Sequence, residues 1–187
     1  LVFAASYQTP QVFFLQNNHW AISVPVTRQS RTPLYLRSGG FGIPGIQIDG
    51  NDVLASYAIT ASALDDARSG KGPRFIEALT YRMGAHTTSD DPTKYRDDAE
   101  LEFWTRNDPI ARYEAFLRFR GEGEAFFADV ATEAEDVASD IRARTLALGV
   151  PEAASMFAHV YSEPHPVMEA QSDWLAAYEA SFEEGQA

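Results

Sequence analysis

The fold is decided by residues 46–80, which read Ile46-Gln47-Ile48-Asp49-Gly50 at one end and Phe75-Ile76-Glu77-Ala78-Leu79-Thr80 at the other. Both are short apolar runs next to turn residues, a pattern typical of strands. A helix is predicted between them, because Asn51 or Asp52 can cap its start and Ser69-Gly70 can end it. A strand, a helix and a strand joined by short connections form a βαβ unit. The sequence therefore predicts a parallel sheet in an α/β fold.

Another apolar run precedes this unit. Val12-Phe13-Phe14-Leu15 is continuous and rich in β-forming residues, which predicts a strand buried on both faces. In the helix over 51–68, one face is expected to hold Val53, Tyr57, Ala61, Leu64 and Arg68.

The second half of the chain has a helical pattern. Asp108 is suited to be an N-cap, and Pro109 to be the first helical residue after it. Three apolar stripes follow, and they contain Ile110, Tyr113, Phe116 and Leu117, then Phe127, Val130, Val137, Ile141 and Leu148, then Trp174, Tyr178 and Phe182. We expect an α/β part over residues 1–107 and a helical C-terminal region of the same domain over residues 108–187.

Composition excludes several classes of protein. The 187 residues are 45% hydrophobic, which indicates a globular chain, and the absence of cysteine excludes disulfides and thiolate chemistry. A net charge of −12 argues against binding nucleic acid or an anionic membrane surface. No apolar run approaches the roughly 20 residues of a membrane helix. We expect a cytoplasmic protein, and the start at Leu1 resembles the middle of a longer chain.

Two polar segments are candidates for chemistry. Asn17-Asn18-His19-Trp20 follows the first predicted strand, where ligands bind in open α/β sheets, and its amide and carbonyl oxygens suit Mg²⁺. A simple turn that closes the strand is the alternative. His86 lies in a polar loop over 81–98 and can donate a hydrogen bond or a proton to an anion. A solvated surface loop is the alternative there.

Four motifs in order resemble the alpha subunits of two-subunit E1 enzymes, the branched-chain 2-oxo acid, pyruvate and acetoin dehydrogenases. They are Asn17-Asn18-His19-Trp20-Ala21-Ile22-Ser23, then Gly42-Ile43-Pro44-Gly45 with Ile48-Asp49-Gly50-Asn51-Asp52-Val53, then Ile76-Glu77-Ala78-Leu79-Thr80-Tyr81-Arg82, and then Gly84-Ala85-His86-Thr87-Thr88-Ser89-Asp90-Asp91-Pro92 with Tyr95-Arg96. The tail from Met156 to Pro164 is also similar to that family's C-terminal region. The resemblance implies the C-terminal part of a fold that binds thiamine diphosphate.

The resemblance also implies roles for single residues. Asn18 matches a side chain that coordinates Mg²⁺, Trp20 a residue that does so through its carbonyl, and Ile22 a residue whose backbone contacts the aminopyrimidine ring. His86 matches a histidine that contacts the diphosphate and assists transfer to the lipoyl group. Arg82 and Asp90 match residues that order the loop around the cofactor. Thr87 falls where mitochondrial relatives carry a regulatory phosphoserine, but a hydroxyl alone does not predict regulation.

The chain departs from the family pattern at its start. The family's cofactor motif opens with Gly-Asp-Gly, which is absent from the 16 residues before Asn17, so we expect the aspartate to lie upstream of Leu1. Without this carboxylate and the sheet strands around it, we expect weak cofactor binding and an inactive fragment.

The implied reaction is oxidative decarboxylation of a 2-oxo acid, followed by acyl transfer to the lipoyl group of an E2 acyltransferase. His86 is the expected proton donor. The implied assembly has two alpha and two beta subunits, with the cofactor between them. The loop string from Thr87 to Asp91 favours branched-chain substrates, with pyruvate or acetoin as alternatives. The alternative from another class is a fragment that acts only as a subunit-binding module.

Overall fold

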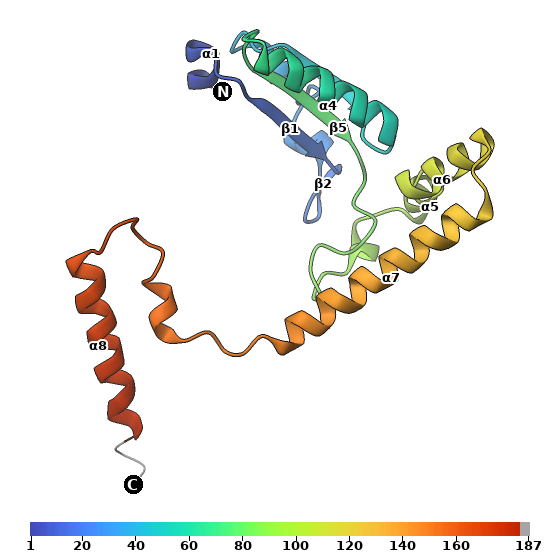
Figure 1. The fold of residues 1–187 in the computed structure, drawn as a ribbon. Helices are drawn as coiled ribbons and strands as arrows, with labels where there is room; N and C mark the ends of the chain where they lie inside the picture. The colour runs from blue at the N-terminus through green and yellow to red at the C-terminus, as the bar shows by residue number, and fades with distance from the viewer. Residues whose placement is uncertain (184–187) are drawn as a thin grey trace. The chain divides into compact units, whose positions relative to one another are not determined.

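The computed structural model describes residues 1–183. It divides into two compact units, one from Leu1 to Gly123 and a second that begins at Glu124 (Figure 1). The division after residue 107 that the sequence predicts within one domain stays a prediction. Contacts within the chain group α6 (Pro109–Arg120) with the first unit.

A three-stranded parallel sheet forms the centre of the first unit. Its strands are β1 (Val12–Asn17), β4 (Gly45–Asp49) and β5 (Arg74–Leu79), in the order β1-β5-β4. The register pairs Asn17 of β1 and Asp49 of β4 with Leu79 of β5, so all three carboxyl ends meet at one edge. This sheet and its crossover helix confirm the predicted α/β fold.

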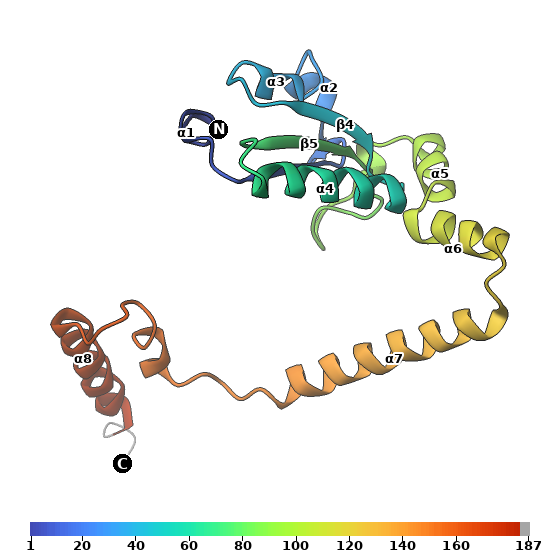
Figure 2. The ribbon, with the colours of Figure 1, turned by 45° about the horizontal axis from the view of Figure 1, so that its top comes forward.

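Helix α4 (Val53–Arg68) covers one face of the sheet (Figure 2). Its N-cap is Asp52, one of the two caps that the sequence allowed, and the Asp52 carboxylate accepts a hydrogen bond from Ala55 N at 2.9 Å. Alternate residues of β5 face the helix, and the buried cluster between them consists of Ile48, Ala63, Ile76 and Ala78.

The face of α4 expected to hold Tyr57 is not the face that the helix buries against the sheet. Tyr57 is 75% exposed, and the helix turns Ala63 and Ala67 towards the sheet. These small side chains let the helix axis approach the strands closely, and Ile59 of the same helix packs against the buried cluster as a partly buried residue.

Burial of β1 on both faces is also wrong. Phe14 is 48% exposed, and no residue of the strand is fully buried. The reason is that β1 is an edge strand, with β5 as its neighbour on one side.

The rest of the first unit consists of short elements around this sheet. They are α1 (Val2–Tyr7), β2 (Trp20–Ala21), β3 (Val24–Pro25), α2 (Val26–Gln29), α3 (Leu36–Gly39), η1 (Pro92–Lys94) and α5 (Asp98–Arg106). Helix α6 begins after the predicted cap Asp108, which accepts from Ile110 N and Ala111 N. Arg112 of α6 donates to Asp49 Oδ2 at 2.9 Å and to Asn51 O at 3.0 Å, which fixes α6 to the end of β4.

The second unit contains α7 (Glu124–Ala147), η2 (Ala153–Met156) and α8 (Pro166–Glu183). The two long helices confirm the helical C-terminal region. Val137, Ile141 and Trp174 are more than half exposed, so their predicted stripes are not core positions within the described residues. Ile110 in α6 is also exposed, because no described segment covers that part of the helix. Among residues 1–183, no helix combines the length and apolar character needed to cross a membrane.

Candidate functional site: a polar turn and a loop at the carboxyl edge of the sheet

The Asn17-Asn18 segment forms a turn directly after β1. Asn17 Oδ1 accepts from His19 N and Asn18 Oδ1 accepts from Trp20 N, each at 3.1 Å, so two consecutive side chains close two consecutive turns. The chain then continues into the β2–β3 hairpin, in which Trp20 pairs with Pro25. A structural turn and a metal-binding role are compatible for Asn18, because its amide oxygen accepts from Trp20 N with one lone pair and has a second lone pair for a metal ion.

Two residues of this hairpin have left-handed backbone. His19 has φ 69° and Ile22 has φ 55°. The conformation is an outlier for a β-branched residue such as Ile22 and requires support from its surroundings. Val26 N donates to His19 O at 2.8 Å, which holds the base of the hairpin closed. Strained backbone held in this way is typical of ligand-binding segments.

Arg82 joins the hairpin to the polar loop. Its backbone N donates to Asn18 O at 3.2 Å, and its Nη2 donates to Ile22 O at 2.7 Å. The same Nη2 donates to Tyr95 Oη at 2.8 Å. Trp20 packs on Tyr95 with ring centroids 5.3 Å apart. The hairpin and the loop therefore form one hydrogen-bonded structure.

Asp90 holds the loop together from within. Its Oδ2 accepts from Tyr95 Oη at 2.5 Å and from His86 N at 2.8 Å, and it lies 4.0 Å from Arg82 Nη2. The Tyr95 hydroxyl hydrogen bond, followed by the His86 N–H, lowers the pKa of Asp90 below its ordinary value. Burial raises the pKa of Tyr95, and its hydrogen bond to Asp90 adds to the rise.

His86 and Thr87 lie on the exposed side of this loop. Asp90 holds the backbone of His86 in the loop, and His86 as a whole residue is exposed. Thr87 Oγ1 lies 3.2 Å from Ser89 Oγ. The six residues singled out from the sequence, Asn18, Trp20, Ile22, Arg82, His86 and Asp90, are thus linked by a continuous set of contacts.

Glu77 is a feature that the sequence interpretation missed. It is 1% exposed in the middle of β5, on the sheet face opposite α4. Its carboxylate accepts from Asn17 Nδ2 at 2.7 Å, from Tyr35 N at 2.9 Å and from Gln47 Nε2 at 3.2 Å. The sequence signal that could have identified Glu77 is an acidic residue inside an apolar run. A carboxylate buried in a strand requires hydrogen-bond partners, so such a residue indicates a polar contact inside the fold.

An aromatic cluster of Tyr81, Trp104 and His19 packs next to the Asn17-Asn18 turn. The rings of Tyr81 and Trp104 stack at 5.4 Å, and His19 packs edge-on against both. Tyr81 Oη donates to Glu100 Oε2 at 3.0 Å. Burial lowers the pKa of His19, against the opposing effect of Glu100 and Glu77. This cluster brings α5, which the sequence did not predict, against the candidate site.

The donors available to a metal ion are neutral. Asn18 Oδ1 and the Trp20 carbonyl are hard oxygen atoms of the kind that Mg²⁺ accepts beside phosphate oxygens. Among residues 1–183, no group of three or more His, Asp and Glu side chains could hold a metal ion. The residues therefore fit one neutral side of a Mg²⁺-diphosphate site, not a complete protein cage.

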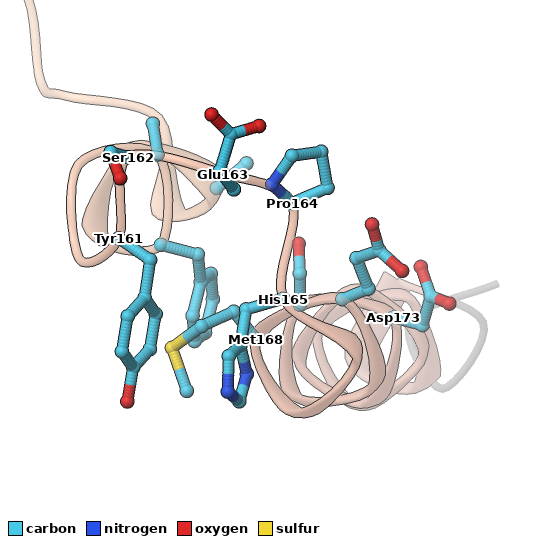
Figure 3. Close-up of a pocket in the computed structure, with 12 residues that line it drawn as sticks. Tyr161, Ser162, Glu163, Pro164, His165, Met168 and Asp173 are labelled. Atoms are coloured by element: carbon cyan, nitrogen blue, oxygen red, sulfur yellow. The ribbon is translucent and has the colours of Figure 1, made fainter.

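A cavity also lies in the second unit, which contains neither the turn nor the loop. A cavity of about 510 Å³ opens between η2 and α8, with Tyr161, Glu163, His165 and Met168 along it (Figure 3). The His165 ring stacks on Tyr161 with centroids 4.2 Å apart. It shares no residue with the turn or the loop, so we do not place the candidate site there.

Comparison with known proteins shows the family of the chain. A family model described as "Dehydrogenase E1 component" matches residues 1–138. The chain belongs to this family. The match confirms the resemblance that the four motifs indicated, and the E1 dehydrogenase family uses thiamine diphosphate.

Several curated relatives are E1 alpha subunits. The chain is 45% identical over 179 residues to the 3-methyl-2-oxobutanoate dehydrogenase subunit alpha of Mycobacterium tuberculosis, covering 95% of this chain and 49% of the relative. It is 42% identical over 178 residues to the pyruvate dehydrogenase E1 component subunit alpha of Acholeplasma laidlawii, covering 91% and 51%. A Staphylococcus aureus pyruvate dehydrogenase alpha subunit is 46% identical over 121 residues, covering 64% and 33%. The chain thus spans about half the length of the first two relatives.

Proposed function

We propose that this E1 chain contributes to thiamine-diphosphate-dependent oxidative decarboxylation of a 2-oxo acid and to acyl transfer to the lipoyl group of an E2 acyltransferase. The observation that carries the proposal is the link between the Asn17–Trp20 turn and the His86 loop through Arg82. The link supports the proposal because it joins the oxygen-bearing turn after β1 to the loop that carries His86, at the carboxyl edge of a parallel sheet, where ligands of such folds bind.

Each site residue has a proposed task. Asn18 Oδ1 and the Trp20 carbonyl would hold Mg²⁺, and the Ile22 backbone would contact the aminopyrimidine ring. Arg82 and Asp90 would keep the loop ordered, so that His86 can contact the diphosphate and supply a proton during transfer to the lipoyl group. The bound cofactor would supply the electron sink for decarboxylation. The protein residues then provide orientation, charge neutralisation and proton transfer.

The proposed partners are an E1 beta subunit, in an assembly of two alpha and two beta subunits, and the E2 lipoyl acyltransferase. The beta subunit would contribute the glutamate that activates the thiazolium ring. We also propose a cytoplasmic location, as expected from the sequence. A subunit-binding module without catalysis is the competing proposal, and it predicts that assembly with the beta subunit leaves decarboxylation independent of Asn18 and His86.

Branched-chain 2-oxo acids are the proposed substrates. The Mycobacterium tuberculosis relative, named for 3-methyl-2-oxobutanoate, supports this choice, and the relatives named for pyruvate support the alternative. The test is decarboxylation by the protein that contains these residues, assembled with its beta subunit and a lipoyl domain. A kcat/KM higher for 3-methyl-2-oxobutanoate than for pyruvate is expected. The reverse order would favour pyruvate, and turnover of neither would contradict the proposed activity.

A further inference from the structure

Glu77 has a hydrogen-bonding arrangement that a neutral side chain cannot reproduce. Its partners are the amide of Asn17, the backbone N–H of Tyr35 and the amide of Gln47, and all three donate to it. One of these hydrogen bonds goes to Oε1 and two go to Oε2. A carboxylate accepts on both oxygens, whereas a glutamine would present an NH₂ group to at least one of these donors.

The hydrogen bond from Asn17 to Glu77 determines which way the Asn17 amide points. With Nδ2 directed at Glu77, Oδ1 faces His19 N and closes the first of the two turns. The reverse orientation would direct the Asn17 NH₂ group at the His19 N–H. The backbone of Asn17 is fixed as well, because its carbonyl accepts from Thr80 N at 2.9 Å. Asn18 therefore begins the second turn from a fixed position.

We propose that Glu77 is a positioning residue for the metal-binding turn: its buried carboxylate orients the Asn17 amide, and the oriented amide fixes the backbone from which Asn18 and Trp20 present their oxygens. The inference rests on the proposed function of that turn. Glu77 itself is 1% exposed, and its carboxylate already accepts from three protein donors. It acts through Asn17, across 60 residues of sequence.

A reciprocal exchange of the two side chains tests the inference. In the Glu77→Gln variant, Asn17 can satisfy either residue 77 or His19 N, not both, so the Kd for thiamine diphosphate with Mg²⁺ is expected to rise about tenfold. In the double variant Asn17→Asp/Glu77→Gln, the new NH₂ group donates to the new carboxylate, which still accepts from His19 N. The double variant is expected to recover affinity to within about threefold of the unmodified protein.

Gln47→Met is the matched control, because it removes a hydrogen bond to Glu77 without changing Asn17. Its Kd is expected to stay unchanged even if its melting temperature falls. The inference is overturned if Glu77→Gln binds like the unmodified protein, or if the double variant recovers melting temperature but not affinity. If Glu77→Gln does not fold, Asn17→Ala breaks the same link and is expected to raise the Kd to a similar extent. An unchanged Kd in Asn17→Ala would overturn the inference.

Hydrogen exchange separates this inference from the proposed function. Without cofactor, the peptide that contains His19 and Trp20 is expected to exchange faster in Glu77→Gln and at the unmodified rate in the double variant. Unchanged exchange in Glu77→Gln would contradict the positioning role. Failure of the unmodified protein, assembled with its beta subunit, to bind thiamine diphosphate with Mg²⁺ would instead contradict the proposed function. The exchange result would then still show whether Glu77 orders the turn.

Discussion

Arg82 Nη2 donates to the backbone carbonyl of Ile22 at 2.7 Å, so a residue that follows β5 holds the strained tip of the β2–β3 hairpin. The two residues are 60 positions apart in sequence, and the parallel pairing of β1 with β5 brings them together. The side chain of Arg82 is mostly buried at 14% exposure and also bonds Tyr95. The hairpin and the loop should therefore lose order together when Arg82 is changed.

Arg82→Met keeps much of the side-chain length and removes every hydrogen bond of the guanidinium. We expect a loss of about 1–3 kcal/mol in the free energy of unfolding, because Ile22 O loses its hydrogen-bond donor and Asp90 loses the positive charge beside it. Chemical denaturation measures this loss. Arg82→Lys retains the charge beside Asp90 and should lose less. Equal stability of the Met variant and the unmodified protein would show that the link does not hold the two segments.

Asp90 makes the order of the loop depend on pH. Its pKa is lowered in the folded protein, by the Tyr95 hydroxyl first and the His86 N–H second. The stability that it contributes is therefore fully present above the ordinary carboxyl pKa of about 4 and is lost as pH falls through the lower folded value. The melting temperatures of the unmodified protein and Asp90→Asn should differ at pH 7 and converge in acid. A difference that does not shrink as pH falls below the ordinary carboxyl pKa would contradict this assignment.

His86→Ala separates the imidazole from the loop structure. The backbone N–H that binds Asp90 stays in place, and the exposed ring contributes little packing, so the loop should remain ordered. Acylation of the lipoyl domain is expected to fall by about 10²–10⁴-fold, the usual contribution of a placed acid or base. Thr87→Ala is the matched control, and its rate should not change. Acylation by His86→Ala at the unmodified rate would remove His86 from the proposed mechanism.

Gly50 is required where β4 passes the end of β5. A Cβ at this position would lie 2.7 Å from Leu79 O and 2.6 Å from Thr80 Cγ2, and Gly50 N donates to the same Leu79 O at 2.7 Å. Gly50→Ala should therefore destabilise the protein by about 1–3 kcal/mol in thermal or chemical unfolding. Gly39→Ala meets no atom within 4 Å and serves as the control. Similar stability of both variants would contradict the close approach.

The sequence predicts local structure where the signal is local. Asp52 before α4 and Asp108 with Pro109 before α6 mark helix starts, and the structure has both caps. The buried face of α4 was not predictable in the same way. It depends on how closely Ala63 and Ala67 approach the sheet, which is a tertiary property.

In the candidate site too, the local segments are predictable from the sequence and the contacts between them are not. The Asn17-Asn18 turn and the His86 loop can be found from their polar composition and from family resemblance. Their connection through Arg82 depends on parallel pairing between β1 and β5, which composition does not specify. Glu77 has partners 30 to 60 residues away, so its role as an acceptor emerges only when the strands are assembled.

The central claim is that this turn holds Mg²⁺ with thiamine diphosphate, and titration calorimetry of Asn18→Ala tests it most directly. The measurement uses the protein that contains these residues, assembled with its beta subunit, with Mg²⁺ present and absent. We predict that Asn18→Ala abolishes Mg²⁺-dependent binding of thiamine diphosphate, because the side-chain oxygen at this position is lost. Binding by Asn18→Ala with the same affinity and the same Mg²⁺ dependence as the unmodified protein would contradict the claim.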